Sequence, residues 1–305
     1  MNILIIAEKK AKVKPFLTAL KQKGVKADYL RISKITLVGK HGQTLIKCLG
    51  KELPAYDAVF IQARTSLAPF VEPLLEELQK IKSYTNIKRD AYYIGANEPY
   101  KFTTLALRNI PTPKTISTIS KKNIELCAKK ISYPIIVKTF LELKPQQSIV
   151  INNNKELTSF VKSIKTDFSA FLIKEFIIGD IISCIVIGER VIAVKRKKIN
   201  DEPVKIEKGT LYYPTTHEKE IAINAANACG YEIARVDIIN EVVIKVDPII
   251  PLDEFNSALS ASIEEGIANF LIEKSKQHEN LIQAPYDLLG LKKLFSKTIL
   301  KRFFK

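Results

Sequence analysis

The chain has 305 residues, of which 46% are hydrophobic and 26% are charged. This composition is that of a folded protein with two or three folding units, and it excludes disordered, collagen-like and small disulfide-stapled proteins. The formal net charge of +16 favours an anionic partner such as a nucleotide, a nucleic acid, an acidic peptide or a membrane surface.

Several sequence features narrow these classes. No apolar stretch of about 18–20 residues is free of charge, so we expect no membrane span. The N-terminus, MNILIIAEKK, has its charges after the apolar run and lacks a cleavage site, so we expect a cytoplasmic location. The four cysteines include no C-x-x-C pair, which fits reduced cytosolic thiols. Tryptophan is absent and the aromatic residues are not interleaved with basic ones, so we do not expect nucleic-acid binding.

The first part of the chain predicts an α/β module of about 95 residues that starts with a β-α-β unit. Its predicted strands are residues 2–7, 27–32, 58–62 and 91–94, with a basic helix after the first strand and a helix over 70–81. The turn Ala7-Glu8-Lys9-Lys10 contains no glycine. The dinucleotide fingerprint G-x-G-x-x-G is therefore missing, and we expect no nicotinamide cofactor.

Residues 109–115 contain Pro111 and Pro113 and predict a stiff connector to the next unit. Beyond it the apolar runs predict a mainly antiparallel α+β layout with one early helix, at 155–164. The predicted strands are 135–138, 148–151, 170–176, 181–187 and 191–197. Thr215 and Glu218 are spaced as a capping box before a helix over 218–229. Strands 233–239 and 242–246 and a helix reaching residue 273 complete the pattern.

Cations on separate strands and helix starts are the groups that a protein needs to hold a polyphosphate. The candidates are Lys101, Lys138, Lys174, Arg196 and Lys205. Lys138 is the most informative, because it ends the buried run Pro134-Ile-Ile-Val-Lys138. The alternative is that this lysine simply emerges into water at a strand end.

A second candidate group is formed by Asp237, Lys245 and Asp247. Side chains alternate along a strand, so Lys245 and Asp247 share a face, and Asp237 on the preceding strand is positioned to meet them across a short hairpin. Two carboxylates facing one cleft are ordinary Mg²⁺ ligands. The lysine between them leaves a structural ion-pair cluster open as the alternative.

Together, several short segments resemble a known family in their order and spacing. They are YPIIVK at 133–138, FLIKEFI at 171–177, GDI at 179–181, VIG at 186–188, AVKR at 193–196, VDI at 236–238 and KVDPIIP at 245–251. Over residues 98–256 the chain resembles the ATP-grasp ligases of the RimK-like type. The resemblance implies an α/β and α+β protein, an ATP-grasp fold preceded by a Rossmann-like domain, with ATP and Mg²⁺ as cofactors.

The resemblance also implies a division of the chain and a role for each candidate residue. The expected parts are a pre-ATP-grasp domain at 1–97, a small lid subdomain at 98–170, a C-terminal subdomain at 171–275 and a basic tail at 276–305. By the resemblance, ATP lies between the two subdomains. Lys101 and Lys138 would contact phosphates, and the backbone of Lys174, Glu175, Phe176 and Ile177 would meet the adenine. Asp180 would lie near the ribose, Arg196 and Lys205 would face the triphosphate or an acyl-phosphate, and Asp237 and Asp247 would hold the metal.

The reaction implied is the activation of a carboxylate as an acyl-phosphate, followed by attack of an amine to form an amide. Two departures from the family pattern keep a second function open. Residues 139–147 contain no glycine where relatives carry a glycine-rich loop, and Lys245 stands where they carry an acidic residue. The alternative is a catalytically impaired homologue that binds a nucleotide or a partner, and a third class is a binder of anionic surfaces.

The last 18 residues, 288–305, predict a basic amphipathic helix. Leu288, Leu291, Phe295 and Ile299 recur at helical spacing, and six of the residues are Lys or Arg with no acidic residue among them. The helix either packs on the body by its apolar stripe or docks on a membrane or a protein partner. The sequence predicts neither the carboxylate and amine substrates nor the oligomeric state.

Overall fold

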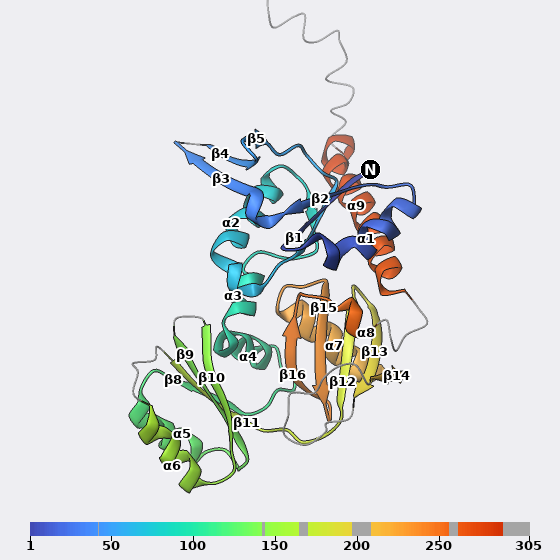
Figure 1. The fold of residues 1–305 in the computed structure, drawn as a ribbon. Helices are drawn as coiled ribbons and strands as arrows, with labels where there is room; N and C mark the ends of the chain where they lie inside the picture. Colours follow the sequence, from blue (N-terminus) through green and yellow to red (C-terminus); the bar gives the residue numbers. More distant parts are fainter. Residues whose placement is uncertain (42, 142–143, 165–169, 197–208, 256–261, 289–305) are drawn as a thin grey trace, which may run out of the picture.

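The computed structural model describes residues 1–41, 43–141, 144–164, 170–196, 209–255 and 262–288, and Figure 1 shows their arrangement. A parallel α/β module, coloured blue to cyan, lies above two antiparallel sheets. None of the described helices is both long enough and apolar enough to cross a membrane. The helix expected over 288–305 lies outside the described residues, apart from Leu288.

The N-terminal module is built on a parallel sheet in the order β2-β1-β6-β7. Its main elements are β1 (Asn2–Ala7), α1 (Lys10–Gln22), β2 (Lys26–Arg31), β6 (Ala58–Gln62), α2 (Ala68–Lys80) and β7 (Tyr84–Thr85). β6 is buried throughout, as its apolar run predicts for a strand covered on both faces. β1 pairs with β2 on one side and with β6 on the other, so the strand order reverses between β1 and β6.

Two parts of this module differ from the sequence prediction. Residues 35–52 form an unpredicted antiparallel hairpin with a short third strand: β3 (Ile35–Lys40), β4 (Gln43–Cys48) and β5 (Lys51–Glu52). Residues 91–94, predicted as a strand, belong to helix α3 (Ala91–Ala96), so that prediction is wrong. The carboxylate of Glu72 on α2 accepts hydrogen bonds from the backbone N–H groups of Asp90 and Tyr92 at 2.8 and 2.6 Å. This distant carboxylate satisfies donors that a helix start leaves unpaired.

The small sheet is antiparallel, in the order β10-β9-β11-β8. Its strands are β8 (Thr115–Thr118), β9 (Ile135–Leu141), β10 (Lys144–Ile151) and β11 (Ala170–Glu175). Helices α5 (Ile124–Ala128) and α6 (Asn154–Ser163) pack on the face that carries Val137 and Ile173. Strand alternation therefore directs Lys138 and Lys174 to the opposite face. Pairing assigns β11 to this sheet, whereas the sequence-based division starts the next subdomain at residue 171.

The larger sheet is also antiparallel, in the order β14-β13-β12-β15-β16. Its strands are β12 (Ile181–Ile187), β13 (Arg190–Arg196), β14 (Thr210–Tyr212), β15 (Ile233–Ile239) and β16 (Val242–Asp247). Helix α7 (Thr216–Ala228) begins with the predicted capping box, in which Thr215 and Glu218 each bond to the other's backbone N–H. The chain then forms α8 (Leu252–Phe255) and α9 (Ile263–Leu288).

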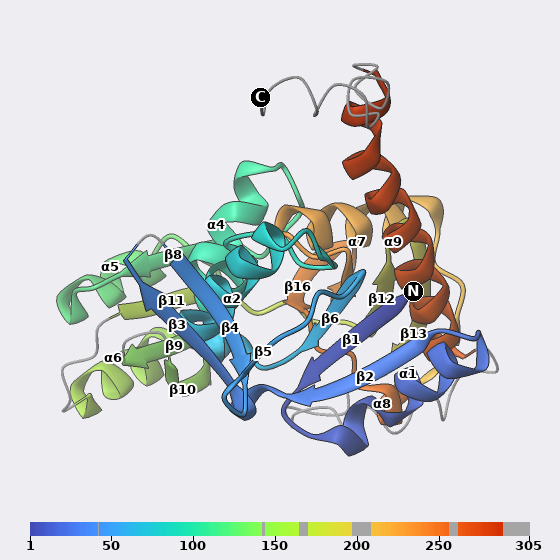
Figure 2. The same ribbon diagram turned by 90° about the horizontal axis from the view of Figure 1, so that it is seen from above.

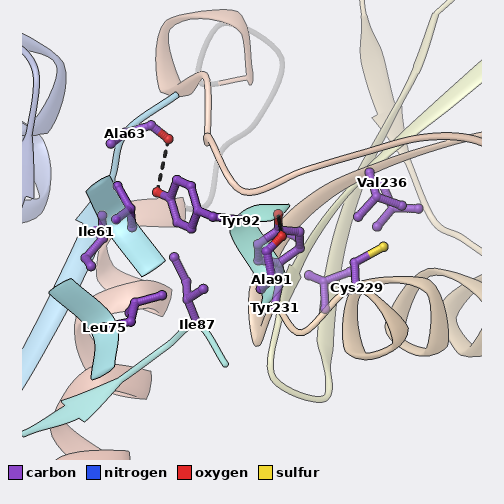
Figure 3. Packing of buried hydrophobic residues seen from close by; sticks show 14 of the residues in the cluster. Ile61, Ala63, Leu75, Ile87, Ala91, Tyr92, Cys229, Tyr231 and Val236 are labelled. Carbon is purple, nitrogen blue, oxygen red and sulfur yellow. Dashed lines mark hydrogen bonds between the residues drawn. The ribbon is translucent and has the colours of Figure 1, made fainter. Parts of the chain in front are cut away.

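The α/β module and the larger sheet share one hydrophobic core (Figure 3). The hydroxyl of Tyr231 donates to the carbonyl of Ala91 at 2.7 Å, and the hydroxyl of Tyr92 donates to the carbonyl of Ala63 at 3.1 Å. Ile87 also forms an antiparallel bridge with Tyr231. On another side of the molecule, α9 packs along α1 (Figure 2). These contacts join the larger sheet firmly to the N-terminal module.

Candidate functional site

Helix α4 (Glu98–Leu107) brings an acidic residue to the lysines of the small sheet. The side chain of Asn97 caps the helix by accepting a hydrogen bond from the backbone N–H of Tyr100 at 3.1 Å. Glu98 therefore occupies the first helical position, with Lys101 one turn further on the same face. This spacing positions both side chains at the junction between the small and the larger sheet.

The Glu98 carboxylate is held by two lysines that come from different strands. Lys138 Nζ on β9 lies 2.8 Å from each carboxylate oxygen, and Lys174 Nζ on β11 lies 3.5 Å from Oε1. Lys174 Nζ also lies 4.5 Å from the centroid of the Phe102 ring. A carboxylate thus lies between two lysines that we expected, from the sequence, to bind a polyphosphate. We call Glu98, Lys101, Lys138 and Lys174 the lysine cluster.

The pKa values of Lys174, Lys101 and Glu98 are shifted from their ordinary values. Burial lowers the pKa of Lys174 to about 8, although Glu98 acts in the opposite direction. Burial also lowers the pKa of Lys101, again against the effect of Glu98. For Glu98, burial raises the pKa, but Lys174 and Lys138 together outweigh it and the pKa falls below its ordinary value. The cluster therefore favours an anion at the position of this carboxylate.

Lys101 connects the lysine cluster to the larger sheet. Its Nζ donates a hydrogen bond to the backbone carbonyl of Val246 on β16 at 3.2 Å. Asp247 and Lys245 both act electrostatically on the Lys101 ammonium. The residues predicted to bind phosphate and those predicted to bind metal are thus brought to neighbouring positions.

The segment expected to meet the adenine joins the two sheets, running from the end of β11 towards β12 (Figure 1). The Glu175 backbone N–H donates to the carbonyl of Lys114 at 2.9 Å, and the Phe176 N–H donates to the carbonyl of Pro134 at 3.2 Å. Ile177 is half-buried. Asp180, expected near a ribose, lies 3.3 Å from Lys195 Nζ in a partly exposed ion pair.

Asp237, expected to be a metal ligand, lies buried among cations. Its Oδ1 accepts from Arg235 Nε at 2.9 Å and from the Ser183 hydroxyl at 2.6 Å, and its Oδ2 accepts from Arg235 at 2.7 Å. Arg196, also buried, approaches the same carboxylate at 3.3 Å and contacts Ser183. The structure therefore brings together Arg196 and Asp237, as required for one site. It does not leave Asp237 open towards a metal.

Asp247 and Lys245 form the other part of this group. Lys245 Nζ lies 3.3 Å from Asp247 Oδ2, and the backbone N–H of Ile249 donates to Oδ1 at 3.0 Å. The strand register sets Asp237 opposite Lys245 rather than opposite Asp247. Within the described part of the chain, no three His, Cys, Asp or Glu side chains gather closely enough to hold a metal ion.

Two adjoining cavities lie at the carboxyl ends of the parallel strands. Their volumes are 380 and 360 Å³, and Glu8 and Arg64 line both of them. Arg31 lines the first cavity, while Lys9, Lys12, Ile249 and Ile250 line the second. Gln62 connects the second cavity to the segment after Asp247. Its side chain donates to the carbonyl of Pro248 at 2.9 Å and accepts from the N–H of Ile250 at 3.1 Å.

Three residues at the site were missed at the sequence level, and one predicted residue cannot be placed. Glu98, Ser183 and Arg235 contact the candidate residues directly. A signal existed for two of them, since Glu98 and Lys101 are spaced for one helix face and Arg235 and Asp237 for one strand face. Lys205 lies outside the described residues.

The fold and the site define a class of protein, in which two antiparallel sheets meet at a cluster of lysines next to a parallel α/β module. A family model for the RimK-like ATP-grasp domain matches residues 97–283. A probable alpha-L-glutamate ligase of Legionella pneumophila (strain Corby) is 23% identical over 240 residues, which are 74% of this chain and 80% of that protein.

Solved structures share the fold. ATP-grasp ligase PsnB, complexed with minimal precursor, Mg and ADP, has a TM-score of 0.68 at 11% identity and covers 90% of this chain and 97% of its own. D-alanine–D-alanine ligase from Bacillus anthracis, complexed with ATP, has a TM-score of 0.63 at 14% identity, with 91% and 97% covered. The chain belongs to the RimK-like ATP-grasp family. The family and the fold expected from the motifs are thereby confirmed.

Proposed function

We propose that this chain uses ATP to join a carboxylate to an amine through an acyl-phosphate. A carboxylate oxygen of the substrate attacks the γ-phosphorus and ADP leaves; the amine then attacks the acyl carbon and inorganic phosphate leaves. Concentrated positive charge is the main physical requirement of the first step, because negative charge develops on the transferred phosphoryl oxygens. Membership of the RimK-like ATP-grasp family supports this reaction.

The observation that carries the proposal is that Lys138 and Lys174 already hold an anion, the carboxylate of Glu98. A carboxylate and a phosphate are recognised by the same charge-assisted hydrogen bonds, so the position of Glu98 is one that a phosphate would take. Lys138 and Lys174 would then bind phosphate oxygens, with Lys101 beside them. Arg196 and Lys205 would face the reacting groups, the backbone at Lys174, Glu175, Phe176 and Ile177 would meet the adenine, and Asp180 would lie near the ribose.

Mg²⁺ would accompany ATP and neutralise charge on its phosphates. Of the two carboxylates expected to hold it, Asp247 fits better, because it is partly exposed and Mg²⁺ is usually bound by one or two carboxylates together with phosphates. Asp237 fits poorly, since it is buried and lies between the guanidinium groups of Arg235 and Arg196.

A substrate other than ATP would occupy the two cavities that Glu8 and Arg64 line. Lys9, Lys12, Arg31 and Arg64 contribute four cations against one carboxylate, so the cavities favour an acidic compound or peptide. The strand order reverses at this place, and ligands of open α/β sheets bind outside such reversal points. The adjoining segment 248–250 follows Asp247 directly, which would bring the bound substrate towards the nucleotide.

A non-catalytic protein that binds a nucleotide or a partner is the second candidate. This candidate is supported by the hydrogen bonds that Asp237 already accepts from Arg235 and Ser183. ADP release measured with ATP, Mg²⁺ and a panel of amino-acid and acidic-peptide acceptors separates the two. Acceptor-dependent ADP release with amide product supports the ligase. Nucleotide binding without such release supports the second candidate.

Two further expectations from the sequence stay proposals. The reaction would take place in the cytoplasm, where ATP is available. The basic tail at 276–305 would either pack on the body by its apolar stripe or contact an anionic membrane or a protein partner, and its first part, through Leu288, continues α9 without a break.

A further inference from the structure

One face of the larger sheet gathers more cations than carboxylates. The register sets Ser183 opposite Asp237, Asp237 opposite Lys245, and Arg235 opposite Asp247. Directly opposed residues of antiparallel strands project to the same face. The other face is apolar and packs against α7, through residues such as Cys184, Val236 and Ala225. The polar face therefore holds a continuous group of charged side chains.

Asp237 is the centre of this group, and it is only 4% exposed. Nε and Nη2 of the Arg235 guanidinium donate to its two oxygens at 2.9 and 2.7 Å, which is the bidentate geometry that arginine forms with carboxylates. Ser183 donates to Oδ1 at 2.6 Å, and Arg196 lies 3.3 Å from the same atom. A divalent ion at Asp237 would have to displace these donors and lie beside two guanidinium groups, whose charge repels it.

Lys245 stands on the neighbouring strand, directly opposite Asp237, with its side chain 45% exposed. Its ammonium lies 3.3 Å from Asp247, which suits a metal better than Asp237 does. A positive charge is therefore already present next to this carboxylate. A protonated amine has no lone pair and cannot be a metal ligand, but it neutralises phosphate as a point charge.

We propose that Lys245 supplies, as a fixed side-chain charge, part of the positive charge that a metal ion would otherwise bring to the phosphates, while Arg235 holds Asp237 away from a metal. The inference rests on the proposed nucleotide binding and adds to it a property of this site: the affinity for a nucleoside diphosphate depends little on Mg²⁺. Arg235 is a positioning residue in this scheme, because it acts by holding Asp237 away from a metal. Lys245, which is more exposed, is the residue that meets the phosphates.

ADP binding to the full chain, measured by calorimetry in excess Mg²⁺ and in EDTA, tests this directly. For the wild type we expect the dissociation constant to differ by less than about threefold between the two conditions. Lys245→Glu replaces the cation by a metal ligand, so its affinity in EDTA should fall at least about tenfold and recover when Mg²⁺ is added. Lys245→Gln, which removes charge without adding a ligand, should bind more weakly in both conditions.

Lys219→Glu is the matched control, because it makes the same charge change at an exposed position on α7. This helix packs on the apolar face of the larger sheet, opposite the polar face that carries Lys245. A wild type that loses affinity tenfold or more in EDTA, or a Lys245→Glu variant that behaves like Lys219→Glu, would overturn the inference while leaving nucleotide binding intact. Absence of ADP binding in both conditions would overturn the proposed function, and this inference with it.

Discussion

At the residue scale, the most informative contact is that of Glu98 with Lys138 and Lys174. An ionised carboxylate stabilises two partly or fully buried ammonium groups that would otherwise repel each other. The same carboxylate occupies the position proposed for a phosphate. Glu98 therefore stabilises the protein without a nucleotide, and it would compete with a nucleotide bound at the proposed site.

Glu98→Gln should have opposite effects on stability and on binding. We expect the free protein to lose about 1–3 kcal/mol of unfolding free energy, because the partly buried Lys138 and the buried Lys174 lose their counter-charge. The affinity for ADP should rise about threefold to tenfold, because the phosphates no longer displace a carboxylate. Thermal melting and calorimetry measure the two effects, with Glu220→Gln on the exposed side of α7 as control. Weaker ADP binding by Glu98→Gln would show instead that Glu98 positions the lysines for the ligand.

If ADP binds at Lys174 as proposed, its affinity should depend on pH. The Lys174 pKa of about 8 means that the ammonium of the free protein deprotonates as the pH rises through 8, while a bound phosphate would hold the proton. The affinity for ADP should therefore fall about five- to tenfold between about pH 7.5 and pH 9. Lys174→Arg keeps its charge throughout this range, so its binding curve should be much flatter. Equal slopes for the wild type and the variant would exclude Lys174 as the titrating group.

At the scale of single elements, the capping box of α7 is a local motif that the sequence predicts and the structure contains. Thr215→Ala removes the side-chain acceptor at 3.1 Å from the Glu218 N–H and should cost about 1 kcal/mol. For a chain of 305 residues the melting temperature should fall by about 1–2 °C. Thr216→Ala, one residue into the helix and exposed, is the control and should change the melting temperature little. Equal effects of the two changes would contradict the capping role.

Local patterns predicted most elements, and contacts between distant residues explain the failures. The apolar runs at 58–62 and 135–138 are strands, because burial on the core side decides their structure. Residues 91–94 have a similarly apolar run, but Glu72, remote in the chain, supplies a helix cap. Lys138 is recognisable because it ends a buried apolar run, although β9 continues beyond it to Leu141. Its pairing with Glu98 depends on how α4 meets the small sheet, which no local pattern contains.

At the scale of the whole molecule, the shared core of the N-terminal module and the larger sheet sets the position of the cavities at Glu8 and Arg64 relative to the lysine cluster. Gly95 lies at the tightest point of this junction. A Cβ there would overlap the Tyr231 hydroxyl and approach Thr65 Cγ2 to 2.8 Å. The glycine thus permits the close approach of α3 to the segment after α7.

Gly95→Ala should destabilise the protein by about 1–3 kcal/mol through overpacking at this junction. Tyr231→Phe removes the overlapping hydroxyl, together with its hydrogen bond to Ala91. In the double variant the loss should be smaller than the sum of the single losses, because both changes act on the same contact. Denaturant unfolding of the four proteins measures this, and additive losses would contradict the proposed clash.

The central claim is that ATP binds at the lysine cluster, where the two antiparallel sheets meet. Calorimetric titration of the wild type, Lys138→Ala and Lys155→Ala with ATP tests it most directly, because Lys155 is exposed on α6, which covers the opposite face of the small sheet. Lys138→Ala should lose a charge-assisted contact worth about 1.5–3 kcal/mol, so its affinity should fall about tenfold to a hundredfold, while Lys155→Ala should bind as the wild type does. Lack of ATP affinity in the wild type at millimolar concentration, or equal affinity of wild type and Lys138→Ala, would contradict the account.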